Sequence, residues 1–587
     1  MANKTGNAFD FRLFKRLLTY TNPYKKTFYF VAFTAILLSL LGVVNPYLTK
    51  IVINQSIVPK DASLLVNFIM LMLGALVLEV LTQFGFIYFA NWLGQQVIRD
   101  IRVKLFAHML QFKKQYYDQS AVGRLVTRAV SDIETIASIF SQGLFMIISD
   151  LLKMLVVVGF MLYQSWRLSL LVFLILPLII YATRVFQKKM KIAFEEVRTQ
   201  VSNLNTFVQE RLTGMKIVQI FHREKVEYAR FKAINEKHKN AWIKTVWYNS
   251  IFFPIAEMAT SIAIGLVVWF GGLRVVAGEE LNLGIIVMFI QLIQMLFRPL
   301  RQIADKFNTL QMGMVAANRV FAILDTKAII KDQGTKIAKN LQGDIEFKQV
   351  SFGYIPDELV LKGIDLKVKA GETVAIVGAT GAGKSTIINL LSRFYEINGG
   401  SISIDGIDIK EFQLKSLRNE IAVVLQDVFL FADTIENNIT LENPKISLED
   451  VIAAAKEIGV HDFINTLPGK YQYNVKERGT MLSSGQRQLI AFLRAYVSKP
   501  SILVLDEATS SVDSYSEQLI QEATDKITQG RTSIIIAHRL ATVKKADKII
   551  VMDAGKIVEI GTHQQLLQKE EGYYKSLYEV QFLEYDL

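Results

Sequence analysis

A glycine-rich run in the second half of the chain has the residue types and spacing of a phosphate-binding loop. It follows the β-branched segment Thr373–Val377 and reads Gly-Ala-Thr-Gly-Ala-Gly-Lys-Ser-Thr. Glycines allow backbone N–H groups to curl around phosphate oxygens, and a helix that begins near Lys384 adds the positive end of its dipole. Lys384 can neutralise the β- and γ-phosphates, and Ser385 can ligate Mg²⁺. The run predicts a nucleoside triphosphate site whose contacting residues are Gly378, Ala379, Thr380, Gly381, Ala382, Gly383, Lys384, Ser385 and Thr386.

Two carboxylates end a second strand further along the chain. The uncharged apolar run Ile502–Leu505 is followed directly by Asp506 and Glu507. A buried strand that ends in two acids places them at the carboxyl edge of a parallel sheet, where ligands bind. Asp506 is predicted to hold Mg²⁺, commonly through water, and Glu507 to be the general base that orients or deprotonates the attacking water. Together with a phosphate loop, the two acids indicate nucleotide hydrolysis.

These residues need a parallel sheet to position them, and the chain beyond Asp325 has the corresponding pattern. Short β-branched runs alternate there with amphipathic helices, which is typical of an α/β domain. The predicted strands are Thr373–Val377, Ile421–Leu425, Ile502–Leu505, Ser533–Ile536 and Lys548–Met552.

The first half of the chain has a different pattern. A helix needs about 20 apolar residues to cross the ~30 Å hydrocarbon core of a bilayer. Runs of this order lie at Phe28–Leu48, Leu64–Ala90, Ala137–Tyr163, Leu168–Phe186, Ser250–Val276 and Leu283–Leu300, and none lies beyond Asp325. The first half is therefore predicted to be an all-α membrane domain with six transmembrane helices.

The composition agrees with a membrane half joined to a soluble half. Of the 587 residues, 51% are hydrophobic and 20% are charged. This average is too apolar for a soluble enzyme and too polar for a chain that lies wholly in a membrane, and it excludes intrinsic disorder. The sequence has no cysteine, which excludes disulfides, thiolate zinc sites, iron–sulfur clusters and cysteine nucleophiles.

The placement of basic residues explains much of the formal net charge of +12. Arg12, Lys15 and Arg16 precede the first span, and the segments 91–136 and 187–249 are rich in lysine and arginine. The positive-inside rule then predicts that the N-terminus and both segments are cytoplasmic, for a protein of the plasma (inner) membrane.

Cytoplasmic helices are predicted to extend this membrane domain. Apolar residues at helical spacing within residues 11–18 predict an amphipathic helix on the membrane surface. The segments 91–136 and 187–249 have helical periodicity and contain no proline, so the spanning helices are expected to continue far into the cytoplasm. Turns that return the chain fit near Gln115–Gly123 and Gly214–Glu224.

An ionisable side chain inside a membrane span costs free energy because it leaves water, so such residues usually have a function or an ion-pair partner. Asp150 and Lys153 are close enough on one helix to pair with each other. Glu79 and Glu257 have no partner nearby in the sequence and can line a polar cavity for cationic cargo. The candidates for such a cavity are Glu79, Asp150, Glu257, Gln291 and Gln294, with ordinary packing as the alternative for the two glutamines.

The second half of the chain, with these residues, resembles the ATP-binding cassette (ABC) ATPases. The segment Leu482–Gln486, Leu-Ser-Ser-Gly-Gln, looks like the signature motif that is unique to that family. The resemblance implies that Tyr354 stacks on adenine and that Gln426 senses Mg²⁺ and the membrane domain. It also assigns a D-loop at Ser511–Asp513, a switch histidine at His538 and a partner-contacting segment at Lys476–Gly479. The resemblance implies that ATP is contacted by Tyr354, Gln426, Ser483, Gly485, Gln486 and Asp513. It implies that Mg²⁺ is bound by Ser385, Gln426 and Asp506.

The first half resembles the membrane domain of ABC exporters, whose half-transporters place six spans ahead of one cassette. The resemblance implies a transmembrane domain at 1–325, a linker at 326–343 and a nucleotide-binding domain at 344–587. The expected fold class is an all-α membrane domain with long cytoplasmic extensions, fused to an α/β P-loop ATPase domain.

A second half-transporter chain is the implied partner, because in ABC dimers the signature of one chain completes the ATP site of the other. Ser483 and the N–H group of Gly485 would contact the partner's γ-phosphate. Ser484 stands where the family usually has glycine, and this change is either harmless or weakens one site. Glu507 and His538 are kept, so the chain can be the catalytic chain of a homodimer or of a heterodimer.

These features imply export or flipping of amphipathic drugs or lipids, driven by ATP with Mg²⁺, through alternating access. Catalysis is expected from Glu507, His538, Lys384 and Gln426. A peptide exporter and an ATP-gated channel or regulator with the same architecture are the alternatives. Six spans exclude a soluble ABC ATPase that acts on DNA, so no nucleic acid is expected as a partner, whereas membrane lipids are.

Overall fold

Two compact units make up the chain. The computed structural model describes residues 10–278, 281–330, 332–506, 514–537 and 540–581. The helical unit comprises Met1–Leu110 and Val122–Lys327, and the α/β unit comprises Gln111–Ala121 and Ala328–Leu587. A short segment from the first half of the chain therefore packs with the second half, which a single boundary near residue 325 does not anticipate.

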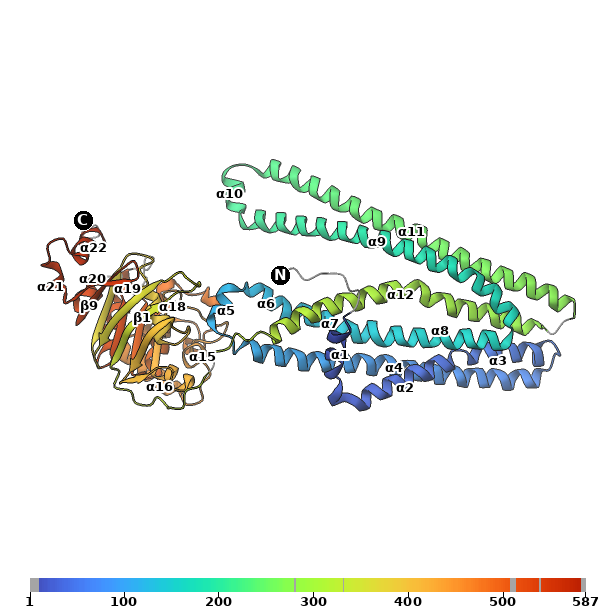
Figure 1. The fold of residues 1–587 in the computed structure, drawn as a ribbon, viewed down its shortest axis with the longest axis horizontal. Coiled ribbons are helices and arrows are strands. Elements are labelled where there is room, and N and C mark those ends of the chain that lie inside the picture. Colours follow the sequence, from blue (N-terminus) through green and yellow to red (C-terminus); the bar gives the residue numbers. More distant parts are fainter. Residues whose placement is uncertain (1–9, 279–280, 331, 507–513, 538–539, 582–587) are drawn as a thin grey trace. The chain divides into compact units, whose positions relative to one another are not determined.

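The helical unit consists of long helices with short connections (Figure 1). Among the described residues its α-helices are α1 (Phe11–Thr19), α2 (Lys25–Leu41), α3 (Val44–Val52), α4 (Ala62–Met109), α6 (Val122–Thr127), α7 (Ile133–Ser138), α8 (Phe145–Gln164), α9 (Trp166–Thr213), α10 (Met215–Ile220), α11 (Glu224–Val276) and α12 (Leu283–Leu324). A 3-10 turn lies at η1 (Asn22–Tyr24), and π-helical turns lie at η2 (Ile53–Ile57), η3 (Arg128–Asp132) and η4 (Ile139–Leu144).

Six helices in the described part of the chain are long and apolar enough to cross a membrane. They occupy Asn22–Ile57, Ala62–Met109, Phe145–Gln164, Trp166–Thr213, Glu224–Val276 and Leu283–Leu300, which confirms the six predicted spans. The third span was expected from Ala137, but α8 begins at Phe145 because the wider turn η4 precedes it. Leu81, Leu155 and Leu174 expose their side chains on these helices, as contact with lipid requires.

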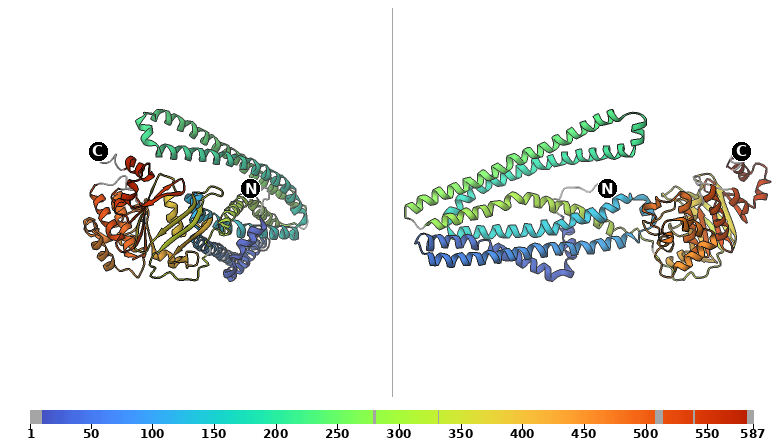
Figure 2. Two further views of the ribbon diagram at one scale, coloured as in Figure 1. Left: turned by 60° about the vertical axis from the view of Figure 1, so that its left-hand side comes forward. Right: turned by 180° about the vertical axis from the view of Figure 1, so that it is seen from behind.

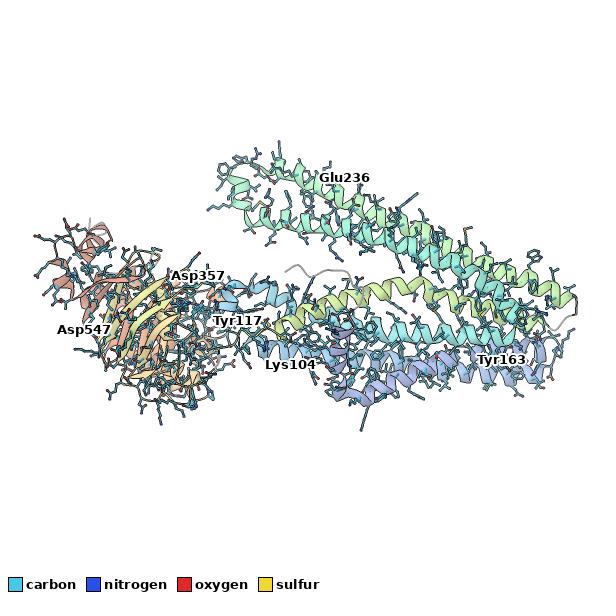
Figure 3. The ribbon with its side chains drawn as sticks, viewed as in Figure 1. Lys104, Tyr117, Tyr163, Glu236, Asp357 and Asp547 are labelled. Atoms are coloured by element: carbon cyan, nitrogen blue, oxygen red, sulfur yellow. The ribbon has the colours of Figure 1, made fainter. Side chains whose placement is uncertain are left out.

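Helices α9 and α11 run side by side and diverge from the remaining helices of the unit (Figure 1; Figure 2 gives two further views). Helix α10 joins them and confirms the turn predicted near Gly214–Glu224. Arg211 Nε lies 2.6 Å from Glu227 Oε2, so an ion pair ties the two helices together beside α10. Figure 3 shows Glu236 on this part of α11 and Tyr163 near the connection from α8 to α9. The hairpin therefore presents α10 at its tip.

The helix predicted at residues 11–18 is confirmed as α1. Asp10 caps it by accepting hydrogen bonds from two backbone N–H groups of its first turn. Leu17 is buried, and Arg16 makes hydrogen bonds of 2.7 and 2.8 Å to the two carboxylate oxygens of Asp325. The guanidinium lowers the pKa of Asp325, and the pair ties α1 to the end of α12.

The α/β unit has two sheets in its described part. The larger has the order β10–β9–β3–β8–β7–β6 and is parallel from β9 to β6, with β10 antiparallel at one edge. The smaller is antiparallel with the order β2–β1–β4–β5. The strands are β1 (Ile345–Phe352), β2 (Leu361–Val368), β3 (Thr373–Gly378), β4 (Gly399–Ile404), β5 (Ile407–Asp408), β6 (Ile421–Val424), β7 (Ile502–Asp506), β8 (Thr532–Ile536), β9 (Lys548–Asp553) and β10 (Lys556–Gly561).

The five predicted strands are β3, β6, β7, β8 and β9, which form the whole parallel part of the larger sheet. The α-helices of this unit are α5 (Lys114–Gln119), α13 (Lys384–Leu391), α14 (Leu414–Glu420), α15 (Ile435–Thr440), α16 (Leu448–Ile458), α17 (His461–Thr466), α18 (Ser484–Val497), α19 (Ser514–Thr528), α20 (Leu540–Lys545), α21 (His563–Leu567) and α22 (Tyr573–Gln581). The 3-10 turns η5 (Lys470–Gln472) and η6 (Glu477–Gly479) lie between α17 and α18.

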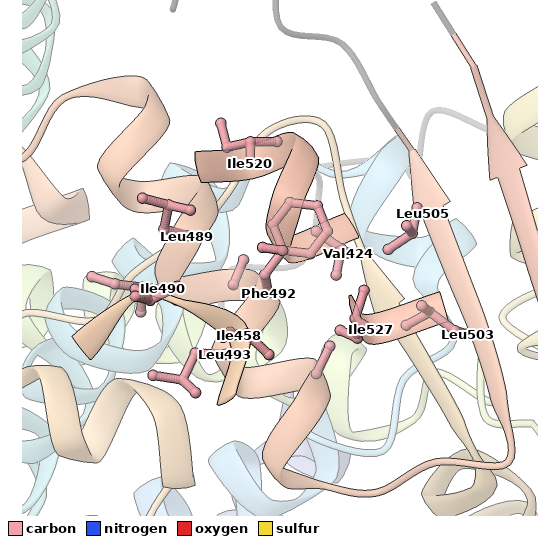
Figure 4. Close-up of a cluster of buried hydrophobic side chains, with 14 of the residues drawn as sticks. Val424, Ile458, Leu489, Ile490, Phe492, Leu493, Leu503, Leu505, Ile520 and Ile527 are labelled. Carbon is pink, nitrogen blue, oxygen red and sulfur yellow. The ribbon is translucent and has the colours of Figure 1, made fainter. Parts of the chain in front are cut away.

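Hydrophobic cores cover both faces of the parallel sheet. Leu503 and Leu505 of β7 belong to a cluster with Phe492 of α18 (Figure 4), and the alternate residues Ile502 and Val504 belong to a second cluster. A strand that is buried on both faces must be apolar throughout, which explains the uninterrupted run. The two cores fix the carboxyl edge of the sheet, where the predicted site residues lie.

Candidate active site

The glycine-rich run connects β3 to α13, as the sequence predicts. Gly383 precedes the helix with a φ of 99°, a left-handed conformation that glycine adopts without strain. At Gly378 a Cβ atom would lie 2.1 Å from the carbonyl oxygen of Met552 on the neighbouring strand β9. The path of the loop therefore requires glycine at both of these positions.

Lys384 is the first residue of α13 and is only 7% exposed. Its Nζ donates hydrogen bonds to the carbonyl oxygens of Gly378 at 2.7 Å and of Ala379 at 2.9 Å. Burial lowers the pKa of Lys384, and the nearby carboxylate of Asp506 partly opposes this change. The amine is thus held within the curve of the loop, at a helix N-terminus that favours a bound phosphate.

Ser385 and Asp506 bring two oxygen ligands together from different elements. Ser385 Oγ of α13 donates a hydrogen bond to Asp506 Oδ2, at the end of β7, over 3.3 Å. A hydroxyl and a carboxylate are the kinds of ligand that Mg²⁺ prefers, alongside phosphate oxygens. The residues present therefore fit the predicted magnesium ion.

Tyr354 is half-buried beside the phosphate loop. Its hydroxyl donates to Thr386 Oγ1 at 3.2 Å and accepts from Asn389 Nδ2 at 3.3 Å. Its ring meets those of Phe352 and Tyr395 edge-on, with centroids 4.9 and 5.1 Å away. Sequence reasoning did not name Asn389, although helical spacing places it one turn beyond the loop, on the same helix.

The segment predicted to be the signature motif begins helix α18. Ser483 Oγ accepts from the N–H of Gln486 at 3.2 Å, and Gln486 Oε1 accepts from the N–H of Ser483 at 3.0 Å, which forms a capping box. Gly485 is buried, whereas Ser483 and Ser484 are exposed. Ser484 is the first residue of the helix and does not have a positive φ, so the backbone there does not require the family's usual glycine.

Gln426 and the segment Lys476–Gly479, both predicted to make contacts, have exposed side chains on the α/β unit. Gln426 follows β6 and is exposed. In the segment Lys476–Gly479, Lys476 and Arg478 have φ values of 59° and 55° and exposed side chains. Left-handed backbone costs a non-glycine residue about 1–2 kcal/mol, and such strain is concentrated at functional surfaces.

Glu507, Asp513 and His538 lie outside the described residues, as do the remaining residues of the predicted D-loop. The strands that precede them are described. β7 and β8 are parallel neighbours, and Asp506 at the end of β7 pairs with Ile536 at the end of β8. The roles of Glu507 and His538 stay predictions from the sequence.

The predicted cavity residues are not brought together within one chain. Glu257 lines a groove of about 580 Å³ on α11 with Pro254, Met258, Ser261 and Ile262. Glu79 of α4 instead accepts a hydrogen bond from Asn45 Nδ2 over 3.4 Å. The residues that line this groove share one face of α11.

The other three cavity candidates have different surroundings. The structure pairs Asp150 of α8 with Lys306 of α12, rather than with Lys153 on its own helix. On α12, Gln291 is half-buried and Gln294 is exposed. An ion pair between helices neutralises Asp150, so its carboxylate is explained without a bound substrate.

Comparison with known proteins covers both units. The family described as "ABC transporter transmembrane region" matches residues 28–300, and the one described as "ABC transporter" matches residues 361–510. The ABC transporter ATP-binding protein YknV of Bacillus subtilis (strain 168), named as uncharacterized, is 36% identical over 570 residues, 97% of this chain and 94% of the relative. The chain belongs to the ABC transporter family.

Other relatives of this ABC transporter carry more specific names. The ATP-dependent lipid A-core flippase of Idiomarina loihiensis is 37% identical over 582 residues, 97% of this chain and 98% of the relative. A second relative from Bacillus subtilis (strain 168), YgaD, is named as a candidate multidrug export ATP-binding/permease protein and is 35% identical over 577 residues, 97% of this chain and 99% of the relative. The chain is thus a multi-pass ABC half-transporter of the exporter type, whose nucleotide-binding α/β unit couples ATP hydrolysis to transport.

Proposed function

We propose that this ABC transporter exports or flips amphipathic drugs or lipids across the plasma (inner) membrane as a dimer. The observation that carries the proposal is the phosphate loop on the same chain as six membrane helices, one of which presents a groove with a carboxylate. The names of a flippase and of a candidate multidrug exporter among its relatives support amphipathic cargo. Basic residues around α1 support a cytoplasmic N-terminus and a cytoplasmic α/β unit.

In this dimer each ATP lies between the phosphate loop of one chain and the signature segment of the other. Capping of α18 uses the Ser483 oxygen as an acceptor, so its hydroxyl hydrogen can still be donated to a phosphate oxygen. The N–H of Gly485 is among the first of α18, which lack carbonyl partners within the helix. Both donors therefore suit a nucleotide held by a second chain.

A groove in the α/β unit supports the same dimer. It has a volume of about 490 Å³, and its lining includes Leu425, Phe429 and Leu441, all more than half exposed. Helix α10 and the residue after it expose apolar side chains of their own, Ile217 at 64% and Phe221 at 69%. Apolar patches of this kind mark protein contacts, and α10 of the second chain is the occupant that we propose for the groove.

Hydrolysis is assigned to residues at the carboxyl edge of the parallel sheet. Lys384 neutralises charge on the β- and γ-phosphates, Glu507 orients the attacking water, and His538 contacts the γ-phosphate. Mg²⁺, when held by the hydroxyl–carboxylate pair described above, neutralises charge on the same phosphates. ATP binds the closed pair of α/β units better than the open pair, and this difference in affinity shifts the helical units between their two orientations.

The dimer can be tested by cross-linking, because the chain has no cysteine to remove first. Thr380 and Ser484 are exposed, and in the proposed dimer they face each other from different chains. We expect full-length protein with Thr380→Cys and Ser484→Cys, in membranes with ATP, to form a disulfide-linked dimer on a non-reducing gel. Lys362→Cys, an exposed position on β2, replaces Thr380→Cys as the matched control and should give none.

The same experiment separates the two kinds of dimer. Cross-linking of the chain by itself indicates a homodimer. Cross-linking that appears only when a related second chain carries one of the cysteines indicates a heterodimer. Absence of the ATP-dependent band in both cases would contradict the proposed arrangement.

The cargo is tested through the Glu257 groove. Cationic amphiphiles are expected to stimulate ATP hydrolysis by the purified transporter, and Glu257→Gln should raise the concentration for half-maximal stimulation about tenfold, the equivalent of ~1.4 kcal/mol for one partly shielded ion pair. Stimulation by neutral amphiphiles should not change. Glu79→Gln is the matched control, since Glu79 lies on another helix and accepts from Asn45. An equal effect of Glu257→Gln on neutral and cationic compounds would count against a charge-recognising groove.

A further inference from the structure

Helix α5 packs with the α/β unit, although it belongs to the first half of the sequence. Two backbone contacts hold its start: Phe112 forms a β-bridge with Ile329, and the N–H of Lys113 donates to the carbonyl oxygen of Ala328 at 2.8 Å. Phe112 is itself only 7% exposed. The helix that follows is therefore held at a fixed place on the α/β unit.

A chain of hydrogen bonds runs from α5 to the phosphate loop through Tyr354. Lys114 Nζ donates to Asn389 Oδ1 over 3.3 Å, and Asn389 Nδ2 donates to the Tyr354 hydroxyl over 3.3 Å. The Tyr354 hydroxyl in turn donates to Thr386 Oγ1 over 3.2 Å. Each group donates toward the loop, and a cation begins the series, so each bond polarises the next in the same sense.

A second path reaches the same tyrosine from the other end of α5. The hydroxyl of Tyr395 donates a hydrogen bond to Asp118 Oδ2. Tyr395 is 7% exposed, and burial raises the pKa of its phenol, with a further increase from the bond to Asp118, so the phenol is the donor. Its ring stands at 87° to that of Tyr354, with centroids 5.1 Å apart. Asp118 thus fixes Tyr395, and Tyr395 supports one side of the Tyr354 ring.

We propose that α5 positions the adenine-stacking surface of Tyr354 through Asn389 and Tyr395, and so sets the affinity for the base of the nucleotide. Asn389 and Tyr395 are then positioning residues, since they act on the nucleotide through Tyr354. This inference rests on the proposed role of Tyr354. It makes the docked state of α5 a determinant of ATP binding, in addition to the phosphate contacts of the loop.

The test compares ATP with inorganic tripolyphosphate, which has the phosphates but no base. In full-length transporter, Tyr395→Phe and Asn389→Ala should each raise the KM for ATP roughly two- to tenfold, about the net effect of one typical hydrogen bond, because both residues act on the base only through Tyr354. We expect kcat to change less than twofold and the inhibition constant of tripolyphosphate to stay constant. Tyr116→Phe is the matched control, since it removes a hydroxyl from α5 for which the described residues show no hydrogen bond.

A double-mutant cycle sharpens the test. Asp118→Ala and Tyr395→Phe remove the two ends of one hydrogen bond, so the double variant should have about the KM of either single variant. Fully additive effects would contradict the path through Tyr395.

The experiment distinguishes a wrong role for α5 from a wrong role for Tyr354. If Tyr354→Ala raises the KM for ATP while Asn389→Ala and Tyr395→Phe do not, Tyr354 binds the base but α5 does not position it. If Tyr354→Ala leaves the KM unchanged, the adenine role of Tyr354 itself is wrong. Equal weakening of ATP and tripolyphosphate in the Asn389 and Tyr395 variants would indicate a distorted loop and would also overturn the inference.

Discussion

Full-length protein with Glu507→Gln is expected to bind ATP with nearly unchanged affinity and to hydrolyse it about 10²–10⁴-fold more slowly. An amide has the shape of the carboxylate but cannot accept the proton of the attacking water. We expect ATP binding to persist because the proposed phosphate contacts come from Lys384 and the loop backbone. Nucleotide binding by equilibrium titration and phosphate release under single-turnover conditions measure the two quantities separately.

The matched control for this variant is Glu522→Gln, which changes an exposed glutamate on α19 of the same unit. We expect it to hydrolyse ATP at the native rate. The Glu507 variant should also accumulate in the ATP-bound dimer, because the step that separates the α/β units is blocked. Undiminished turnover in Glu507→Gln would remove Glu507 from its assigned role as the base.

Lys384→Ala is expected to abolish both hydrolysis and transport, with a loss of turnover of at least about a hundredfold. Its amine lies 2.7 Å from the Gly378 carbonyl and 2.9 Å from the Ala379 carbonyl, inside the curve of the loop. In the proposed mechanism, loss of this amine leaves charge on the β- and γ-phosphates without its neutralising partner as the bond between them breaks. Unlike the Glu507 variant, this one should also bind ATP more weakly, which a titration with a fluorescent ATP analogue will measure.

The stability of the variant must be checked beside this result, because Lys384 is buried and the alanine removes the hydrogen bonds that its amine donates to the carbonyl oxygens of Gly378 and Ala379. A thermal melt of the variant tells a folded protein that lacks activity from an unfolded one. Lys410→Ala, at an exposed lysine of the same unit, should keep both activity and stability. Native turnover by a folded Lys384→Ala variant would contradict the phosphate-loop assignment.

The parallel part of the sheet could be predicted because its strands are buried on both faces. Ile502–Leu505 and Ile421–Leu425 contain no polar residue, and each of the other three runs has a single polar residue, at its first position. The antiparallel strands β1 and β2 were not among the predicted strands. Their burial alternates between buried and more exposed residues along the strand, and β1 also has irregular register against both of its neighbours. The phosphate loop was located because its spacing is set by the backbone path around a phosphate.

Contacts between residues that are far apart in the sequence could not be predicted from sequence patterns. Asp150 pairs with Lys306, which lies 156 positions away, and the nearer Lys153 offered a plausible but different partner. Tyr395 and Asp118 are 277 positions apart, and no periodicity or spacing connects them. Such pairs depend on which elements pack together, whereas local patterns determine only which elements form.

The packing of Gln111–Ala121 with the α/β unit means that one cut cannot divide this protein into two intact halves. A fragment that starts at Ala328 would lack the bridge partner of Ile329, and Tyr395 would lose its carboxylate acceptor. Catalytic fragments prepared in this way would therefore have an uncovered surface close to Tyr354. Kinetic constants measured on such a fragment would describe an incomplete α/β unit. Adding residues 111–121 as a separate peptide would restore the missing segment.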